Sequence, residues 1–210
     1  MATRHHPTVT GATARQQLQQ QLIREKARDV IRRRVIGFLG GALVVAVAAL
    51  VAFGLWSARS TDSNVSRQAP AFSLTTTAGT TVSLSDYRGK PVILYFNEGA
   101  GCGSCTQQMA AIEKDPGFTR SGITVLPIVM NTAEQIEPDL ATFGVKTPYL
   151  LDDGTVSKAY DTLGKGMHEG LPGHGFVLID ADGNQRWQGD YPSMWIAPGD
   201  LLKEVTGRLS

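Results

Sequence analysis

The strongest constraint on the fold is a Cys-x-x-Cys pair set between an apolar run and a helical pattern. The run at 91–96, Pro-Val-Ile-Leu-Tyr-Phe, predicts a buried strand, and a glycine-rich turn leads from it to Cys102. Residues 106–114 predict a helix. Cys102 then lies at a helix N-terminus, where unpaired N–H groups and the helix dipole stabilise a thiolate, and Cys105 lies one turn further on. A thiolate is the nucleophile of thiol–disulfide exchange, so this order of elements predicts a redox-active pair.

The chain contains no other cysteine. A structural zinc site needs four ligands, and the only further candidates beyond the motif in this part of the chain are His168 and His174. We therefore expect a redox pair rather than a metal site, and no cofactor.

The near-neutral total charge hides two unlike parts. Residues 1–34 carry eight basic and two acidic side chains, whereas the chain from residue 57 onward carries twelve basic and seventeen acidic ones. The second part is mildly acidic and has no basic stripe, so a nucleic-acid partner is not expected.

Residues 35–56 predict a transmembrane anchor. They contain no charged side chain, and as a helix they would extend about 33 Å, enough to cross a bilayer core. Three arginines, 32–34, precede this run, so the positive-inside rule places the basic tail 1–34 in the cytoplasm and the rest of the chain outside. Within the tail a helix over 18–35 competes with a disordered or loosely helical segment, and we favour the latter.

A cleaved signal peptide is the alternative to an anchor. The charged segment before the apolar run and the run itself are both long for a signal peptide, so we favour an uncleaved, single-pass anchor in the plasma membrane. Residues 57–69 are polar and lack periodicity, which predicts a flexible linker. The domain beyond the linker would then be extracytoplasmic, where disulfide chemistry is possible.

Residues 70–210 predict one α/β domain with a mixed central sheet flanked by helices. A hairpin opens it, strands and helices then alternate, and a second hairpin and a helix close it. The expected elements are a hairpin at 70–84, strands at 91–96, 123–130, 149–151, 176–179 and 185–188, and helices at 106–114, 132–143, 156–163 and 198–209. Pro138 is expected to kink or interrupt the second of these helices.

Several segments together resemble the redoxin (AhpC/TSA-like) branch of the thioredoxin superfamily. They are Ala-Pro-Ala-Phe-Ser-Leu at 69–74, Leu-Ser-Asp-Tyr-Arg-Gly-Lys-Pro at 84–91, Cys-Gly-Ser-Cys at 102–105 and Phe-Val-Leu-Ile-Asp-Ala-Asp-Gly at 176–183. The chain looks most like membrane-tethered thiol–disulfide oxidoreductases of the TlpA/ResA type. The resemblance implies exchange with exported thiol or disulfide proteins, electrons from a membrane donor, and a role in cytochrome c maturation.

By this resemblance Cys102 is the attacking cysteine and Cys105 the buried resolving one. Members often have tryptophan before the first cysteine, where this chain has Gly101, and thioredoxins have a buried aspartate where it has Phe96. Glu98 is the nearest carboxylate, so it is the candidate for proton transfer, the alternative being a solvated loop acid.

The family's cis-proline lies just before the strand that begins at residue 176. Pro172 is the candidate, but it falls two positions early, and His174 occupies the expected place. Either the loop has an insertion or His174 faces the disulfide instead, so Pro172, Gly173 and His174 are all candidate substrate-binding residues.

Two related activities were weighed against exchange. A peroxiredoxin pattern, Pro-x-x-x-Thr-x-x-Cys, would need proline and threonine at positions 95 and 99, which are Tyr95 and Gly99 here. Copper chaperones of the Sco type share the fold and add a distant histidine, which His168 or His174 would supply with Met167 as a soft neighbour. Their cysteines are spaced by three residues and these by two, so copper binding is the weaker alternative.

A docking domain with a vestigial cysteine pair is the third alternative. Four side chains near the C-terminus could form a partner surface, although such residues are more often core or rim: Trp187, Tyr191, Met194 and Trp195.

Overall fold

The structure is a computed structural model that describes residues 11–57, 59–164 and 169–209. The chain divides into two units, Met1–Trp56 and Ser57–Ser210. This boundary coincides with the end of the predicted anchor.

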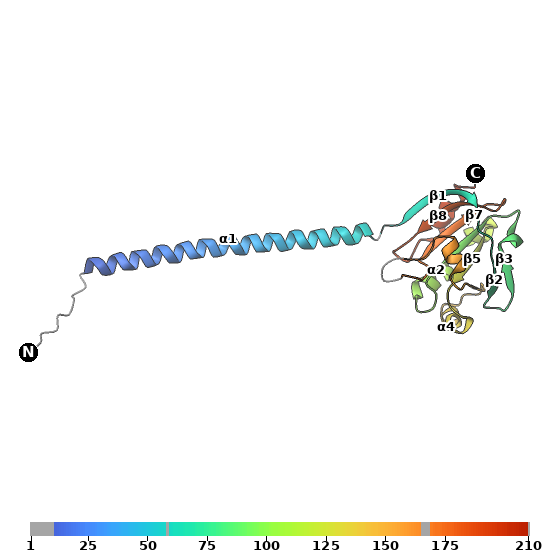
Figure 1. Ribbon diagram of the computed structural model, residues 1–210, viewed down its shortest axis with the longest axis horizontal. Coiled ribbons are helices and arrows are strands. Elements are labelled where there is room, and N and C mark those ends of the chain that lie inside the picture. The colour runs from blue at the N-terminus through green and yellow to red at the C-terminus, as the bar shows by residue number, and fades with distance from the viewer. Residues whose placement is uncertain (1–10, 58, 165–168, 210) are drawn as a thin grey trace, which may run out of the picture. The chain divides into compact units, whose positions relative to one another are not determined.

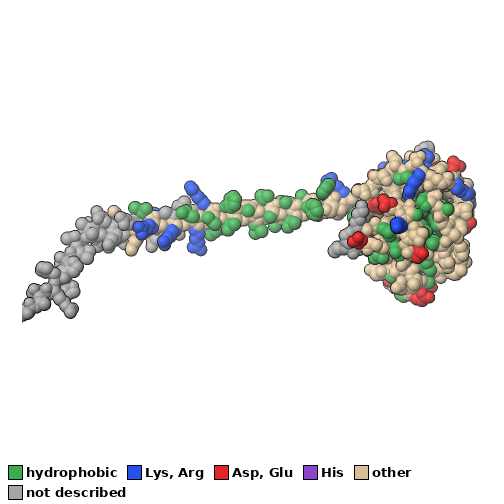
Figure 2. All heavy atoms as spheres, viewed as in Figure 1, with side chains coloured by type: hydrophobic (Ala, Val, Ile, Leu, Met, Phe, Trp, Pro, Cys, Tyr) green, Lys and Arg blue, Asp and Glu red, His purple; other side chains and the backbone are tan. Residues whose placement is uncertain are grey.

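The described residues of the first unit lie in helix α1, Gly11–Ser57, which ends one residue past the boundary (Figure 1). Within it, Ile31–Ser57 is long and apolar enough to cross a membrane, as a signal anchor and a signal peptide both are. Figure 2 shows apolar side chains along this segment and lysine or arginine side chains just before it. The helix extends through the tail from Gly11 onward, which corrects the expectation of a disordered or loosely helical segment.

The second unit has the predicted α/β thioredoxin-like architecture. Its described residues form one sheet of eight strands in the order β1-β8-β7-β4-β5-β6-β2-β3. Strands β4, β5 and β6 are parallel, and the remaining pairings are antiparallel. The strands are β1 Thr61–Gln68, β2 Ser73–Thr76, β3 Thr81–Ser83, β4 Val92–Phe96, β5 Thr124–Val129, β6 Leu150–Leu151, β7 Gly175–Ile179 and β8 Asn184–Asp190.

Helices cover both faces of this sheet. The helices are α2 Gly103–Lys114, α3 Pro116–Ser121, α4 Ala133–Phe143, α5 Thr155–Ala159 and α6 Pro198–Thr206, with a short 3₁₀ turn at Leu84–Tyr87. The fully buried strand β4 alternates between two cores, as the pleat requires. Ile93 and Tyr95 pack with α2, α3, α4 and α6, whereas Leu94 and Phe96 pack with α5 and the first hairpin.

Strand β1 corrects the prediction of a flexible linker. Thr61–Gln68 pairs antiparallel with β8, and Thr61 lies opposite Asp190. Seven of its eight residues are exposed, so the strand lacks the alternation by which a half-buried strand is recognised. Backbone pairing and polar contacts hold it instead, among them the bond from Arg67 Nε to Gln185 Oε1 at 2.8 Å.

The helices also differ from the predicted ones in several places. Pro138 lies inside α4 without ending it. Helix α5 ends at Ala159, four residues before the predicted end. Helix α3 was not predicted, although Asp115 caps it by accepting the N–H groups of Gly117 and Phe118, and Pro116 occupies the first turn.

Candidate functional site

A disulfide joins Cys102 to Cys105 at the start of α2, with Cα atoms 5.3 Å apart. Cys102 is the N-cap of this helix, and its sulfur accepts the backbone N–H of Cys105 at 3.3 Å. Cys102 is half-buried, whereas Cys105 is 0% exposed. One cysteine of the pair is therefore partly exposed at a helix N-terminus, and its partner is enclosed.

The turn between β4 and Cys102 is held by side-chain acceptors. Gly99 N–H donates to Asn97 Oδ1 at 3.1 Å, Ala100 N–H to Asn131 Oδ1 at 3.0 Å and Gly101 N–H to Asp139 Oδ2 at 2.8 Å. Asn131 and Asp139 were missed from the sequence. The parallel pairing of β4 with β5 could have found Asn131, which follows β5, because the carboxyl ends of parallel neighbours meet at one edge of a sheet. Asp139 lies within α4, so this pairing does not place it.

A buried hydrogen-bond network connects the backbone of Cys105 to Tyr95 and His174. The Tyr95 hydroxyl donates to the carbonyl oxygen of Cys105 at 3.0 Å and lies 3.2 Å from Nδ1 of His174. A carbonyl oxygen only accepts, so the tyrosine proton goes to Cys105 and a ring N–H of His174 donates to the tyrosine oxygen. Tyr95 also stacks on Phe176, with ring centroids 4.6 Å apart.

Burial keeps the side chains of this hydrogen-bond network in their neutral forms. It lowers the pKa of His174, which is 3% exposed, to about 4, so the imidazole is neutral at pH 7. Burial also raises the pKa of Tyr95 well above its usual value, and the charges of Tyr149 and Glu98 add to this effect. Tyr95 and His174 are therefore both neutral, and the hydrogen bond from Tyr95 to Cys105 holds the start of α2.

A dependence of stability on pH follows from His174. The unfolded chain binds a proton near pH 6.5 and the folded protein only near pH 4, so stability is lost as the pH falls through this window. The loss is expected to reach about 3 kcal/mol at the lower end. Urea unfolding of the wild type and of His174→Gln between pH 4 and 7 measures it, and parallel curves for the two proteins would contradict the assignment.

Some of the site residues that the sequence predicts around the disulfide lie together in the structure, and others do not. Glu98, Gly173 and His174 line one cavity of about 440 Å³, and Glu98 is half-buried there. Pro172 lies outside this lining and forms an isolated bridge with Leu163. The described residues contain no cis peptide bond, and His174 rather than Pro172 lines the cavity, so which of the two takes the cis-proline place stays a prediction.

The copper alternative concerns residues around the disulfide and in the loop before His174. The described residues contain no group of three or more histidine, cysteine or acidic side chains that could hold a metal ion. His168 and Met167 lie outside the described residues.

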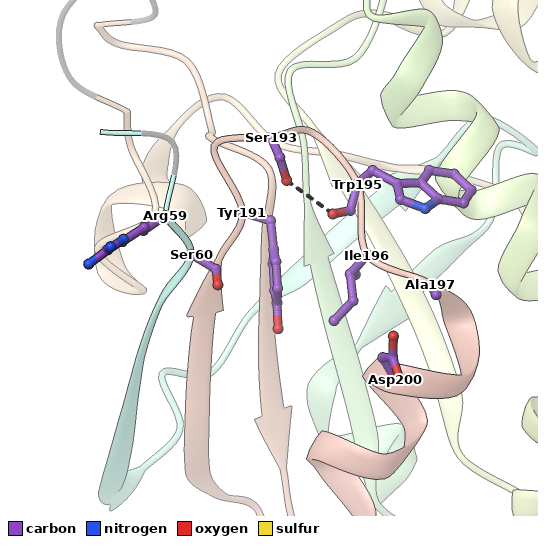
Figure 3. Close-up of a pocket in the computed structure, with 8 residues that line it drawn as sticks. All are labelled: Arg59, Ser60, Tyr191, Ser193, Trp195, Ile196, Ala197 and Asp200. Carbon is purple, nitrogen blue, oxygen red and sulfur yellow. Dashed lines mark hydrogen bonds between the residues drawn. The ribbon is translucent and has the colours of Figure 1, made fainter. Parts of the chain in front are cut away.

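The C-terminal aromatic residues divide between core and rim. Trp187 is fully buried, and its indole N–H donates to Asp62 of β1 at 3.4 Å. Trp195 is 41% exposed and lines an open cavity of about 760 Å³ with Arg59 and Tyr191. In Figure 3 the Tyr191 ring lies between Ser60 and Ile196, while the indole of Trp195 points away from them.

Comparison with known proteins identifies relatives of several kinds. A putative peroxiredoxin of Mycobacterium tuberculosis is 34% identical over 122 residues, which cover 55% of this chain and 78% of that protein. The thioredoxin-like protein YneN of Bacillus subtilis is 28% identical over 133 residues, 60% of this chain and 78% of that protein.

Solved structures show the same fold. The crystal structure of peroxidoxin BcpB from Mycobacterium tuberculosis has a TM-score of 0.59 at 19% identity and covers 70% of this chain and 99% of that chain. The solution structure of a putative protein disulfide isomerase from Bacteroides thetaiotaomicron has a TM-score of 0.51 at 25% identity and covers 68% and 88% of the two chains.

The family model that matches is described as AhpC/TSA family and spans residues 65–188. It begins inside β1, includes both cysteines and ends in β8. The site is thus a cysteine disulfide in a thiol-based redox domain, and the chain belongs to the AhpC/TSA family.

Proposed function

We propose that the protein is a membrane-anchored thiol–disulfide oxidoreductase that exchanges electrons with disulfides of exported proteins. The observation that carries this proposal is the disulfide between a half-buried cysteine at a helix N-terminus and a fully buried cysteine one turn later. An accessible, dipole-stabilised thiolate can attack, and an enclosed neighbour can resolve.

In the reduced protein the Cys102 thiolate attacks one sulfur of the substrate disulfide. A new sulfur–sulfur bond forms, and the other substrate sulfur leaves as a thiolate that takes up a proton. Cys105, deprotonated, then attacks Cys102 Sγ and releases the second substrate thiolate. The substrate gains two electrons and the protein loses two, so a thiol reductant must restore the pair. Glu98, half-buried beside His174 in one cavity, is the proposed proton acceptor for Cys105.

Location and partners are part of the proposal. The apolar helix Ile31–Ser57 supports an anchor, and the arginines before it support a cytoplasmic N-terminus with the redox domain outside. The substrates proposed are exported thiol or disulfide proteins, including apocytochromes c, and the reductant is a membrane electron donor. The pair itself needs no cofactor.

A second candidate function is thiol peroxidase activity, which the putative and named peroxiredoxins among the relatives favour. Two residues oppose it. Tyr95 replaces the proline of the peroxidatic pattern, and its hydroxyl donates to the carbonyl oxygen of Cys105. A threonine in place of Gly99 would overlap Asn131. Consumption of hydrogen peroxide by the reduced protein at rates comparable with disulfide reduction would favour the peroxidase instead.

Trapping tests the proposal directly. In membranes of the native cell, the full-length Cys105→Ser variant should hold partners as mixed disulfides on Cys102, visible on a non-reducing gel. The Cys102→Ser, Cys105→Ser double variant is the matched control and should trap none. Capture of a cysteine-bearing exported protein supports exchange. An empty gel, together with tight cuprous-ion binding by the reduced wild type that is lost in Cys102→Ser, would favour the copper alternative.

A further inference from the structure

Three side chains on the segment from β5 to the end of α4 fix the turn that carries the disulfide. We call Asn131, Asp139 and Phe143 the α4 clamp. Asn131 accepts the N–H of Ala100 and Asp139 that of Gly101, at 3.0 and 2.8 Å. The Phe143 ring closes over the first residue of α2, since a Cβ on Gly103 would lie 3.2 Å from it. The clamp thus contacts positions 100, 101 and 103, on both sides of Cys102.

Asp139 is the charged member of the clamp. Its carboxylate accepts the N–H of the residue directly before Cys102, and its side chain is only half-exposed. Its charge also acts on the core below the disulfide. Burial raises the pKa of the Tyr149 hydroxyl, and the carboxylates of Glu113 and Asp139 raise it further. That hydroxyl is buried and has no hydrogen-bond partner among the described residues.

We propose that Asp139 is a positioning residue that holds a negative charge against the disulfide turn, destabilises the Cys102 thiolate and so makes the reduced pair a stronger reductant. This inference rests on the proposed function of the pair. The helix N-terminus favours the thiolate, and the carboxylate opposes it. Stabilising a thiolate stabilises the reduced form, so a carboxylate that opposes it shifts the equilibrium toward the disulfide.

Other titratable groups lie in this turn or on the elements packed around it, and the test must separate Asp139 from them. They are Glu98 in the turn, Tyr95 on β4, Glu113 on α2, Tyr149 before β6, His174 before β7, and Glu134 and Glu137 on α4 itself. The Glu113 carboxylate accepts the N–H groups of Lys146 and Thr147, so it binds the loop after α4. Glu137 is exposed on the same helix as Asp139 and provides a matched control.

The experiment compares full-length Asp139→Asn with Glu137→Gln. The asparagine keeps an oxygen acceptor for Gly101 and removes the charge, whereas the glutamine removes one charge elsewhere on α4. The rate of iodoacetamide alkylation of reduced protein against pH gives the Cys102 thiol pKa. We expect it to fall by roughly half a unit to one unit in Asp139→Asn and to change little in Glu137→Gln.

Equilibration with glutathione above both thiol pKa values gives the second readout. A tenfold change in that equilibrium constant, about 30 mV toward a more oxidising pair, accompanies one pKa unit. Unchanged values in Asp139→Asn, or equal shifts in both variants, would overturn the role of Asp139. Failure of the wild type to reduce any disulfide would instead overturn the proposed exchange function, so the two failures are distinguishable.

Discussion

Replacement of Cys102 by serine is expected to abolish disulfide reduction by this protein. The reaction needs a thiolate at the accessible end of the pair, and a serine hydroxyl neither ionises near neutral pH nor forms a mixed disulfide. The rate of reduction of a small aromatic disulfide should fall by a factor on the order of 10³ or more, as when other enzymatic nucleophiles are removed. Release of the coloured thiol in single-turnover assays of the reduced protein measures it.

Two variants at neighbouring positions make this result specific. Ser104→Ala changes an exposed side chain between the cysteines and should retain the wild-type rate within a few-fold. Cys105→Ser keeps the attacking thiol, so it should consume one equivalent of disulfide and then stop with the mixed disulfide on Cys102. Substantial activity in Cys102→Ser would place the chemistry outside the pair.

Replacement of Gly99 by alanine is expected to be the most destabilising small change in the turn. Gly99 has φ +79° and is buried, and an added Cβ would overlap Asn131 Oδ1 and lie 3.2 Å from the Val129 Cβ. The left-handed backbone costs an alanine about 1–2 kcal/mol, and displacing Asn131 removes a hydrogen bond worth about 1 kcal/mol. Urea denaturation should therefore show a loss of about 3 kcal/mol.

Gly101 provides the matched control. It has φ +90°, similar backbone strain, and open space where a Cβ would be added. Gly101→Ala should therefore lose only the backbone cost of about 1–2 kcal/mol. Equal losses in the two variants would show that the contact between Gly99 and Asn131 contributes nothing to stability.

The parts of the fold that the sequence predicts well are those in which local pattern and tertiary role agree. The all-apolar run of β4 and the glycine-rich turn into α2 place the cysteines, because a buried strand and a helix N-terminus both have strong local signatures. Strand β1 has no such signature. Its polar sequence, Thr-Asp-Ser-Asn-Val-Ser-Arg-Gln, forms an edge strand through backbone pairing and polar side-chain contacts, which hydrophobic patterning does not detect.

The candidate site shows the same division. The cysteines and Glu98 follow from the motif, whereas the acceptors of the turn do not. Asn131 and Asp139 lie 31 and 38 residues from the N–H groups that they bind. The pairing of β5 with β4 brings Asn131 there, and the packing of α4 beside α2 brings Asp139 there. The position of His174 just before a predicted strand makes it a candidate for the site. Its hydrogen bond to Tyr95, however, depends on the pairing of β4 with β7, which the sequence does not show.

In an anchored protein, strand β1 would also shorten the flexible tether between the membrane helix and the redox domain. Thirteen free residues at 57–69 would extend up to about 45 Å, whereas the chain from Ser57 to the first paired residue, Thr61, extends at most about 14 Å. Thr61 pairs with Asp190, Asp190 with Gly175 and Gly175 with Phe96, so the chain joins the sheet at the edge from which the disulfide turn leaves. In an anchored protein, so short a tether would confine the sulfurs to a small volume near the end of the anchor, and it would favour encounters with a cysteine pair fixed inside that volume.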